Sequence, residues 1–212
     1  MRHPPTSTMR LRKLSMSLSR LEIRDQLDAS LEQYVTPGDL ASRWLFDIQS
    51  FGDLPRGCRV VDLGSGNGIL GIGASILGAS YVKFVETDKE LCKLNRRNAE
   101  SILKDGTFEV CNQRVGVDNL DISDYDLIIS NPPWGRLKEG ADSDFLHEIS
   151  IFGACTHIMH SANAKHIGKR FKDLGWEVDK YAEADFPLTA SYSHHKMNRG
   201  ATRAGFWRLT PP

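Results

Sequence analysis

A strand, a glycine-rich turn and a helix follow one another between residues 59 and 77, and this order limits the folds open to the chain. Residues 59–63 are mostly branched and apolar, as is typical of a buried strand. Gly64, Gly66 and Gly68 let a ligand approach the backbone closely, and the start of the helix predicted over 69–77 favours a negatively charged group. The sequence therefore predicts a ligand-binding strand-turn-helix unit.

Apolar runs and helical patterns alternate along most of the chain. This alternation predicts an α/β fold, with a parallel sheet, helices on both faces and ligands at the carboxyl ends of the strands. We expect strands at 59–63, 81–85, 107–111, 125–129, 154–160, 177–183 and 203–209, and further helices at 69–77, 88–103, 144–152 and 163–174.

Composition limits the size and the compartment. The 212 residues suffice for one α/β domain with a full core but not comfortably for two. Lysine and arginine number 27, as do aspartate and glutamate, so net charge neither favours nor excludes nucleic acid. The four cysteines lie far apart without a C-x-x-C pair, which indicates reduced thiols. The longest mostly apolar stretch, 69–79, is too short to span a bilayer. We expect a cytoplasmic protein that does not enter the membrane.

The N-terminal region, residues 1–34, is predicted to be a tail and an amphipathic helix ahead of a single domain at 35–212. Leucines at positions 11, 14, 18 and 21 recur at helical spacing, with basic residues around them. A docking helix with a solvated charged side and an RNA-facing helix explain this pattern about equally well.

A helix start follows this region. Thr36 as N-cap, Pro37 at the first helical position and Asp39 at the third form a typical start signal. Gln33 and Tyr34 come just before it. Because a helix start does not require their polar groups, they are candidates for lining a ligand pocket.

Polar residues stand at the ends of the first three predicted strands. Asp62 can meet an ammonium group, Glu86 can accept hydrogen bonds from both hydroxyls of a ribose, and Gln113 would lie beside an adenine. The spacing Gly66-x-Gly68-x-x-Gly71 also matches the dinucleotide fingerprint. The glycines alone therefore cannot choose between NAD and S-adenosylmethionine.

The motif Asn131-Pro132-Pro133-Trp134 ends the predicted strand 125–129 abruptly, since proline cannot donate to a sheet ladder. The side-chain oxygen of Asn131 and the carbonyl of Pro132 can accept hydrogens from a planar amine, and Trp134 can stack on a planar substrate. The alternative is a turn after a core strand with a packing tryptophan. This amine-methylation signature, with Asp62 ahead of the glycines, favours S-adenosylmethionine over NAD.

Basic and aromatic residues gather near the C-terminus, where no acid follows Phe186. Such one-sided charge suits phosphate contacts, and the aromatic rings suit stacking on bases. A His-His pair can bind metal, but no carboxylate or cysteine lies close by in sequence, so we expect none. The candidate RNA-binding residues are Tyr192, His194, His195, Lys196, Arg199 and Arg203.

Several segments together resemble the methyltransferase-like protein 5 family and its archaeal relatives, over about residues 11–209. They are Leu-Glu-Gln-Tyr-x-Thr-Pro at 31–37, Asp-Leu-Gly-x-Gly-x-Gly-Ile-Leu at 62–70, Leu-Gly-Ala at 77–79, Asn-Pro-Pro-Trp-Gly at 131–135 and Ser-Tyr-Ser-His-His-Lys at 191–196. This chain departs from the family in having Gln113 for the usual aspartate and Trp134 for the usual phenylalanine.

The resemblance implies a Rossmann-like class I methyltransferase with a seven-stranded, mostly parallel sheet whose last strand is antiparallel. It implies S-adenosylmethionine as cofactor, the N6 amine of an adenosine in small-subunit ribosomal RNA as target, and a small zinc-binding activator subunit. Together with the polar residues at the strand ends and before the first helix of the domain, the candidate cofactor-binding set is Gln33, Tyr34, Thr36, Asp62, Gly64, Ser65, Gly66, Asn67, Ile69, Glu86, Gln113 and Asn131.

Two other functions compete with RNA methylation. A protein-glutamine methyltransferase would use the same Asn131 and Pro132 acceptors on an amide, but the basic aromatic segment near the C-terminus argues against it. A cofactor-binding scaffold for ribosome assembly would not need the intact motif at 131–134.

Overall fold

The computed structural model describes residues 10–24, 34–187 and 201–212. Several predicted site residues lie outside these ranges, namely Gln33, Tyr192, His194, His195, Lys196 and Arg199.

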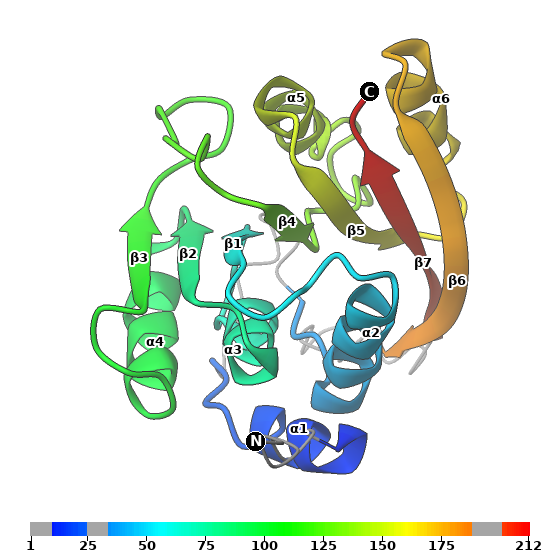
Figure 1. Ribbon diagram of the computed structural model, residues 1–212. Coiled ribbons are helices and arrows are strands. Elements are labelled where there is room, and N and C mark those ends of the chain that lie inside the picture. Colours follow the sequence, from blue (N-terminus) through cyan, green and yellow to red (C-terminus); the bar gives the residue numbers. More distant parts are fainter. Residues whose placement is uncertain (1–9, 25–33, 188–200) are drawn as a thin grey trace, which may run out of the picture.

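Seven strands form one sheet in the order β3-β2-β1-β4-β5-β7-β6 (Figure 1). Strands β1 to β5 pair in parallel, whereas β7 runs antiparallel to β5 and β6. The predicted mostly parallel sheet with an antiparallel last strand is thereby confirmed. The strands are β1 Arg59–Leu63, β2 Tyr81–Glu86, β3 Phe108–Asn112, β4 Leu127–Ser130, β5 Cys155–Ser161, β6 Glu177–Pro187 and β7 Ala201–Thr210.

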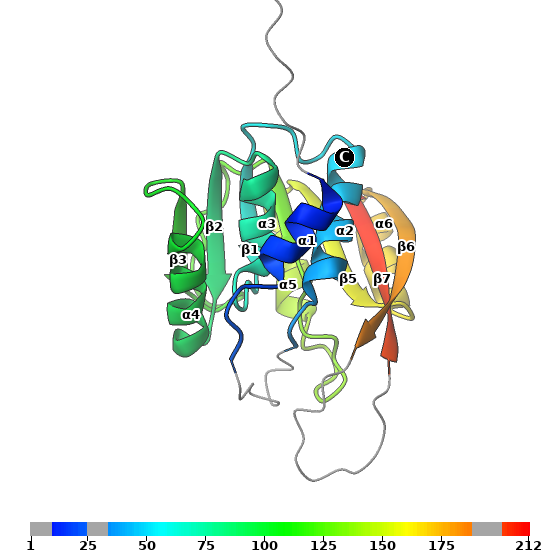
Figure 2. The same cartoon turned by 90° about the horizontal axis from the view of Figure 1, so that it is seen from below.

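Helices cover both faces of the sheet (Figure 2). Helices α1 to α4 lie on one face, and α5 and α6 lie on the other. Their bounds are α1 Leu11–Leu18, α2 Gly38–Ser50, α3 Ile69–Leu77, α4 Lys89–Glu100, α5 Ser143–Phe152 and α6 Lys165–Asp173.

Two apolar clusters fill the space between the sheet and these helices. Val60 and Ile129 belong to the cluster under α1, α2 and α3, whereas their neighbours Val61 and Ile128 belong to the cluster under α5 and α6. Side chains alternate between the two faces along a strand. Because both faces are covered, the strands appear in the sequence as continuous apolar runs.

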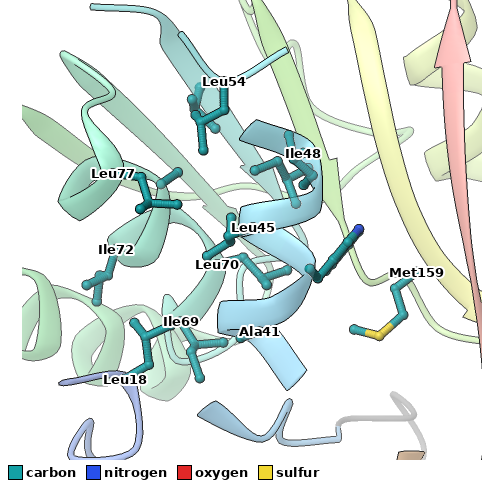
Figure 3. Packing of buried hydrophobic residues seen from close by; sticks show 14 of the residues in the cluster. Leu18, Ala41, Leu45, Ile48, Leu54, Ile69, Leu70, Ile72, Leu77 and Met159 are labelled. Atoms are coloured by element: carbon teal, nitrogen blue, oxygen red, sulfur yellow. The ribbon is translucent and has the colours of Figure 1, made fainter. Parts of the chain in front are cut away.

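Helix α1 packs on α2 and α3 through its leucines. Leu14 and Leu18 are buried in the same cluster as α2 and α3, and Leu18 lies near Ile69 in Figure 3. Gly38 permits the close approach, since a Cβ there would lie 2.4 Å from Oγ of Ser19. The leucine side is thus a docking surface, and the basic residues around it lie at the surface.

The predicted start of α2 is wrong by one residue. The helix begins at Gly38, and Pro37 before it is extended, with φ −61° and ψ 144°. The hydroxyl of Thr36 does not cap the helix, because it accepts a hydrogen bond from Nδ2 of Asn131 at 3.2 Å. The Thr36 hydroxyl therefore contacts Asn131, which follows the carboxyl end of β4.

The described ranges contain no helix with the length and apolar character that crossing a bilayer requires. All four cysteines are free thiols, with Cys58 and Cys92 buried and the other two half-buried.

Candidate active site

A cleft of about 320 Å³ opens where β1, β2, β3 and β4 end. The segment before α2 and the start of α5 complete its walls. It brings together most of the predicted site residues, namely Tyr34, Thr36, Gly64, Ser65, Gly66, Asn67, Ile69, Glu86, Gln113, Asn131, Pro132 and Pro133.

The glycine loop forms the floor beside β1. Gly66 has φ +53° and donates its backbone N–H to Oε2 of Glu86 at 2.8 Å. Gly68 has φ +87°, and a Cβ there would lie 2.6 Å from Oδ1 of Asn95. A larger residue would therefore be strained at Gly68 and would also clash. Gly68 thus fixes the path of the loop against Asn95, while Gly64, Ser65, Gly66 and Asn67 line the cleft.

Glu86 ends β2 at the opposite side of the glycine loop. Its Oε1 accepts hydrogen bonds from the backbone N–H groups of Thr87 and Asp88, both at 2.9 Å. Burial raises the pKa of Glu86, and the bonds from Asp88, Gly66 and Thr87 act against that rise. The carboxylate is 7% exposed, yet it lines the cleft. It is therefore a rigid acceptor at the cleft wall.

Asp62 does not lie in the cleft wall, which corrects its predicted contact with an ammonium group. It is 1% exposed, and its Oδ2 accepts the backbone N–H of Gly71 at 2.8 Å. Burial, opposed by the bond from Gly71 and aided by nearby Glu86, raises the pKa of Asp62 to about 8. The strand end places this side chain beneath the glycine loop, where it ties β1 to α3.

Gln113 offers an unused acceptor to the cleft. Its Nε2 donates to the carbonyl of Asn119 at 2.9 Å, which fixes the amide. Its Oε1 is buried and has no hydrogen-bond partner among the described residues. A buried amide oxygen without a partner is unfavourable, so a ligand with an N–H group at this point would relieve it.

Asn131 is held by both of its amide atoms. Oδ1 accepts from Nε1 of Trp134 at 3.0 Å, and Nδ2 donates to Oγ1 of Thr36 at 3.2 Å. Because a carbonyl oxygen has two lone pairs, Oδ1 can accept one more hydrogen. The amide is thereby oriented, with Pro132 and Pro133 beside it in the cleft wall.

Trp134 does not present a free face to a substrate, which corrects the predicted stacking. It is 8% exposed and is not part of the cleft wall. Its ring stacks on His160 with 5.9 Å between centroids and 24° between planes, and it also meets Phe186 at 5.2 Å. Apolar and aromatic neighbours bury the indole, and only its N–H reaches the site.

Arg203 is also placed differently from the expectation. No acid follows Phe186 in the sequence, but the antiparallel pairing of β6 with β7 places acidic residues of β6 beside Arg203. Arg203 forms ion pairs with Glu183 and Asp185, each at 3.2 Å. Its charge is therefore largely offset within the protein.

Sequence reasoning missed the walls contributed by the first turn of α5 and by the loop before it. A Cβ on Gly64 would lie 2.9 Å from Cε1 of Phe145, so this ring packs over the glycine loop. An aromatic residue soon after the Asn-Pro-Pro motif was the available signal. The other residues missed are Arg24, Val35, Leu70, Val85, Thr87, Leu91, Arg114, Val115, Lys138, Gly140, Ala141 and Asp144.

A parallel sheet with a glycine loop after its first strand and a cleft at its carboxyl edge defines a nucleotide-cofactor enzyme. The sequence model of the methyltransferase small domain matches residues 38–159, and the chain belongs to this family. The protein is an S-adenosylmethionine-dependent methyltransferase, and the cofactor is S-adenosylmethionine rather than NAD.

Particular relatives resemble the chain over nearly its whole length. The rRNA N(6)-adenosine-methyltransferase METTL5 of Danio rerio is 29% identical and covers 96% of this chain and 100% of its own. Protein MJ0284 of Methanocaldococcus jannaschii is 33% identical over 86% of each chain. The structure of PH1948 from Pyrococcus horikoshii, a candidate RNA methyltransferase, is 29% identical, with a TM-score of 0.83 over 96% of this chain and 98% of its own. The resemblance to the methyltransferase-like protein 5 family is confirmed.

Proposed function

We propose that this enzyme methylates the N6 amine of an adenosine in small-subunit ribosomal RNA. The observation that carries the proposal is the Asn131 amide, which lies in the cleft wall and is fixed by Trp134 and Thr36. The Danio rerio relative, named for this reaction on rRNA, supports it over nearly the full chain. The small subunit rests on the family resemblance. A cytoplasmic location belongs to the same proposal, since free thiols suit a reducing compartment.

The residues of the cleft fit S-adenosylmethionine. Gln113 supplies an unpaired buried acceptor for the exocyclic amine of the cofactor's adenine. Glu86 supplies a rigid carboxylate for the ribose hydroxyls, and the open backbone of Gly64 and Gly66 receives the amino-acid part. Gln33, outside the described residues, belongs to the proposed pocket on the family resemblance. These contacts orient the cofactor relative to Asn131.

The bound cofactor supplies an activated methyl group on a sulfonium. The target amine is a poor nucleophile because its lone pair is delocalised into the adenine ring. Oδ1 of Asn131 and the carbonyl of Pro132 accept its two hydrogens and draw the lone pair back onto nitrogen. This nitrogen would take the methyl group of bound S-adenosylmethionine as the carbon–sulfur bond breaks, and the surplus amine proton would leave to solvent.

Cations at the cleft support a nucleic-acid substrate. Arg114 and Lys138 contribute to its walls, and a third cation there, Arg24, is offset by Asp88 at 2.7 Å. Phosphates of an RNA could contact this rim in the same way that they contact other basic grooves. We assign the remaining RNA contacts to Tyr192, His194, His195, Lys196 and Arg199, and a smaller one to Arg203.

The activator subunit is proposed on the family resemblance alone. A suitable place for it is β3, which forms one edge of the sheet and pairs only with β2 among the described strands. An unpaired strand edge can accept a strand from a partner.

Nucleoside mass spectrometry tests the proposed reaction. Ribosomal RNA from a strain that lacks this protein should gain N6-methyladenosine when treated with the purified wild-type enzyme and S-adenosylmethionine. The Asn131→Ala enzyme serves as the matched control and should add little. Methyl transfer to a protein glutamine, with the RNA unmodified, would contradict the proposal.

A further inference from the structure

His160, near the carboxyl end of β5, is buried beside the active-site motif. It is 1% exposed, and its ring lies nearly parallel to the indole of Trp134 at 5.9 Å. Trp134 in turn donates its N–H to Oδ1 of Asn131 at 3.0 Å. An apolar ring would fill this space equally well, and burying an imidazole is unfavourable without hydrogen bonds. Packing alone therefore does not explain a histidine here.

The other side of His160 faces Asp142. Its Nε2 lies 3.3 Å from Oδ2 of Asp142, a carboxylate that is itself 4% exposed. Burial acts to raise the pKa of Asp142, but contacts with His160 and His166 lower it to about 2. Asp142 thus stays ionised and immediately precedes α5, the helix whose first turn carries Phe145.

His160 consequently touches both ends of one loop. The loop runs from Asn131 to Asp142, and several of its residues line the cleft, including Pro132, Lys138 and Ala141. The ring face of His160 contacts the beginning of the loop through Trp134, and its Nε2 faces the end. A single side chain on the rigid sheet can therefore set the position of the whole wall.

A metal ion does not explain this group. Asp142, His160 and His166 each offer a ligand atom within 4.8 Å of the others. However, Nε2 of His166 lies 2.6 Å from Oδ2 of Asp142. Two ligands of a tetrahedral zinc ion, each about 2.0–2.1 Å from the metal, would lie roughly 3.3 Å apart. The shorter distance is that of a hydrogen bond.

We propose that His160 is a positioning residue for methyl transfer, holding the loop from Asn131 to Asp142 closed and orienting the Asn131 amide through Trp134. It touches neither substrate nor cofactor. The inference rests on the proposed role of Asn131, and it concerns turnover rather than cofactor affinity.

The kinetic test uses His160→Phe, which keeps an aromatic ring against Trp134 and removes the nitrogen that faces Asp142. We expect kcat to fall by up to roughly fivefold, the size expected for losing the single neutral hydrogen bond by which Trp134 orients the Asn131 amide. The Kd of S-adenosylmethionine should change less than kcat, because Glu86 and the glycine loop, which follow β2 and β1, are not part of the loop from Asn131 to Asp142. His166→Ala is the matched control, because it also loses a contact with Asp142, while its ring meets that of His160 edge-on and makes no ring contact with Trp134 among the described residues.

A normal kcat in folded His160→Phe would overturn the inference. An equal loss in His166→Ala would also overturn it, because the effect would then come from Asp142 in general.

A second measurement does not depend on activity. The indole N–H resonance of Trp134, assigned with Trp134→Phe, should shift in the ¹H–¹⁵N spectrum of His160→Phe and stay in place in His166→Ala. An unchanged resonance in His160→Phe would refute the coupling. If the wild-type enzyme transferred no methyl group to RNA, the proposed function would fail, while this resonance would still report on the coupling.

Discussion

Two buried histidines on β5, His157 and His160, have opposite surroundings. Both are almost completely buried. His157 is fully paired, with Nδ1 3.0 Å from the hydroxyl of Tyr181 and Nε2 2.9 Å from Oδ2 of Asp53. Arg208 donates two further hydrogen bonds to the Asp53 carboxylate, at 2.6 and 2.9 Å. His160 has a single polar neighbour at 3.3 Å, and neither ring nitrogen has a well-formed hydrogen bond among the described residues.

The difference indicates that the contacts of His157 stabilise the fold, whereas those of His160 belong to the active site. A buried polar network whose members are all satisfied makes the structure rigid, whereas an incompletely satisfied one is unfavourable for folding. The network of His157 lies at the amino end of β5, away from the cleft, and Tyr181 links it to Trp44 of α2 at 2.8 Å. The contacts of His160 lead to Asn131. We therefore expect variants at the amino end of β5 to lose stability and variants near its carboxyl end to lose turnover.

The largest effect on turnover is expected at Asn131, to which the contacts of His160 lead. Asn131→Ala should lower turnover by roughly 10²–10³, as losing one positioned polar group does in other enzymes, with little change in the melting temperature. Single-turnover methyl transfer and thermal melts on the same sample measure both. A large fall in melting temperature with normal transfer per folded molecule would make the motif a structural turn.

In the His157 network at the amino end of β5, Asp53→Ala should lower the free energy of unfolding by about 3 kcal/mol, because His157 and Arg208 lose their shared partner. This is at the low end for a buried pair, since Arg208 is 26% exposed. Methyl transfer per folded molecule should be unchanged. Asp173→Ala is the control, because the Asp173–Lys169 pair is exposed and should contribute less than about 1 kcal/mol. Denaturant unfolding measures both free energies. Equal losses of stability in Asp53→Ala and Asp173→Ala would show that the buried network contributes no more than an exposed ion pair.

On the cofactor side of the cleft, two variants of Glu86 are compared. Glu86→Ala should weaken binding of S-adenosylmethionine by about 1.5–3 kcal/mol, the usual range for hydrogen bonds to a charged group. Glu86→Gln removes the charge but keeps one acceptor oxygen, which can serve either Gly66 or the pair Thr87 and Asp88, so it separates the charge from part of the loop contacts. Titration calorimetry on both variants would count against a ribose contact if neither affinity changed.

A smaller effect is expected for Trp134→Phe, which keeps an aromatic ring beside His160 but removes the N–H that holds Asn131. Losing one neutral hydrogen bond corresponds to about 1 kcal/mol, or roughly fivefold in kcat. The melting temperature should change little. A full loss of activity would instead place the indole in contact with the substrate.

The smallest effect concerns pH. Burial lowers the pKa of His157 below its usual 6.5, although neighbouring Asp53 acts to raise it. Between these two pKa values the folded protein binds fewer protons than the unfolded chain, so this contribution to stability is complete above pH 6.5 and is lost as pH falls through the folded-state pKa. His157→Gln should flatten the decline of melting temperature over this range. A decline as steep as that of the wild type would assign the dependence to other groups.

The sheet was predictable because its strands are buried on both faces and appear as apolar runs between turn residues. The expected strand at 59–63 matches β1, and the other expected strands differ at their ends by a few residues. The glycine loop and Glu86 were predictable for the same local reason, since strand ends place them at one edge.

The errors came from contacts between distant segments. Thr36 resembles a helix cap in sequence, but its hydroxyl bonds to Asn131, a partner that no local pattern reveals. Arg203 appeared unpaired because its acids come from β6. Trp134 appeared available for stacking because His160, which buries it, lies on another strand. Local patterns thus located the site, and tertiary packing decided what each side chain does there.

The burial of Asp62 makes the stability of the fold depend on pH. With a pKa of about 8, well above the ordinary 3.8, this carboxyl keeps a proton in the folded protein that it releases in the unfolded chain. Between these two pKa values the folded protein binds more protons, so this contribution to stability is fully present below pH 3.8 and is lost as pH rises through about 8. The side chain that ties β1 to α3 is therefore a point at which alkaline surroundings loosen the base of the glycine loop.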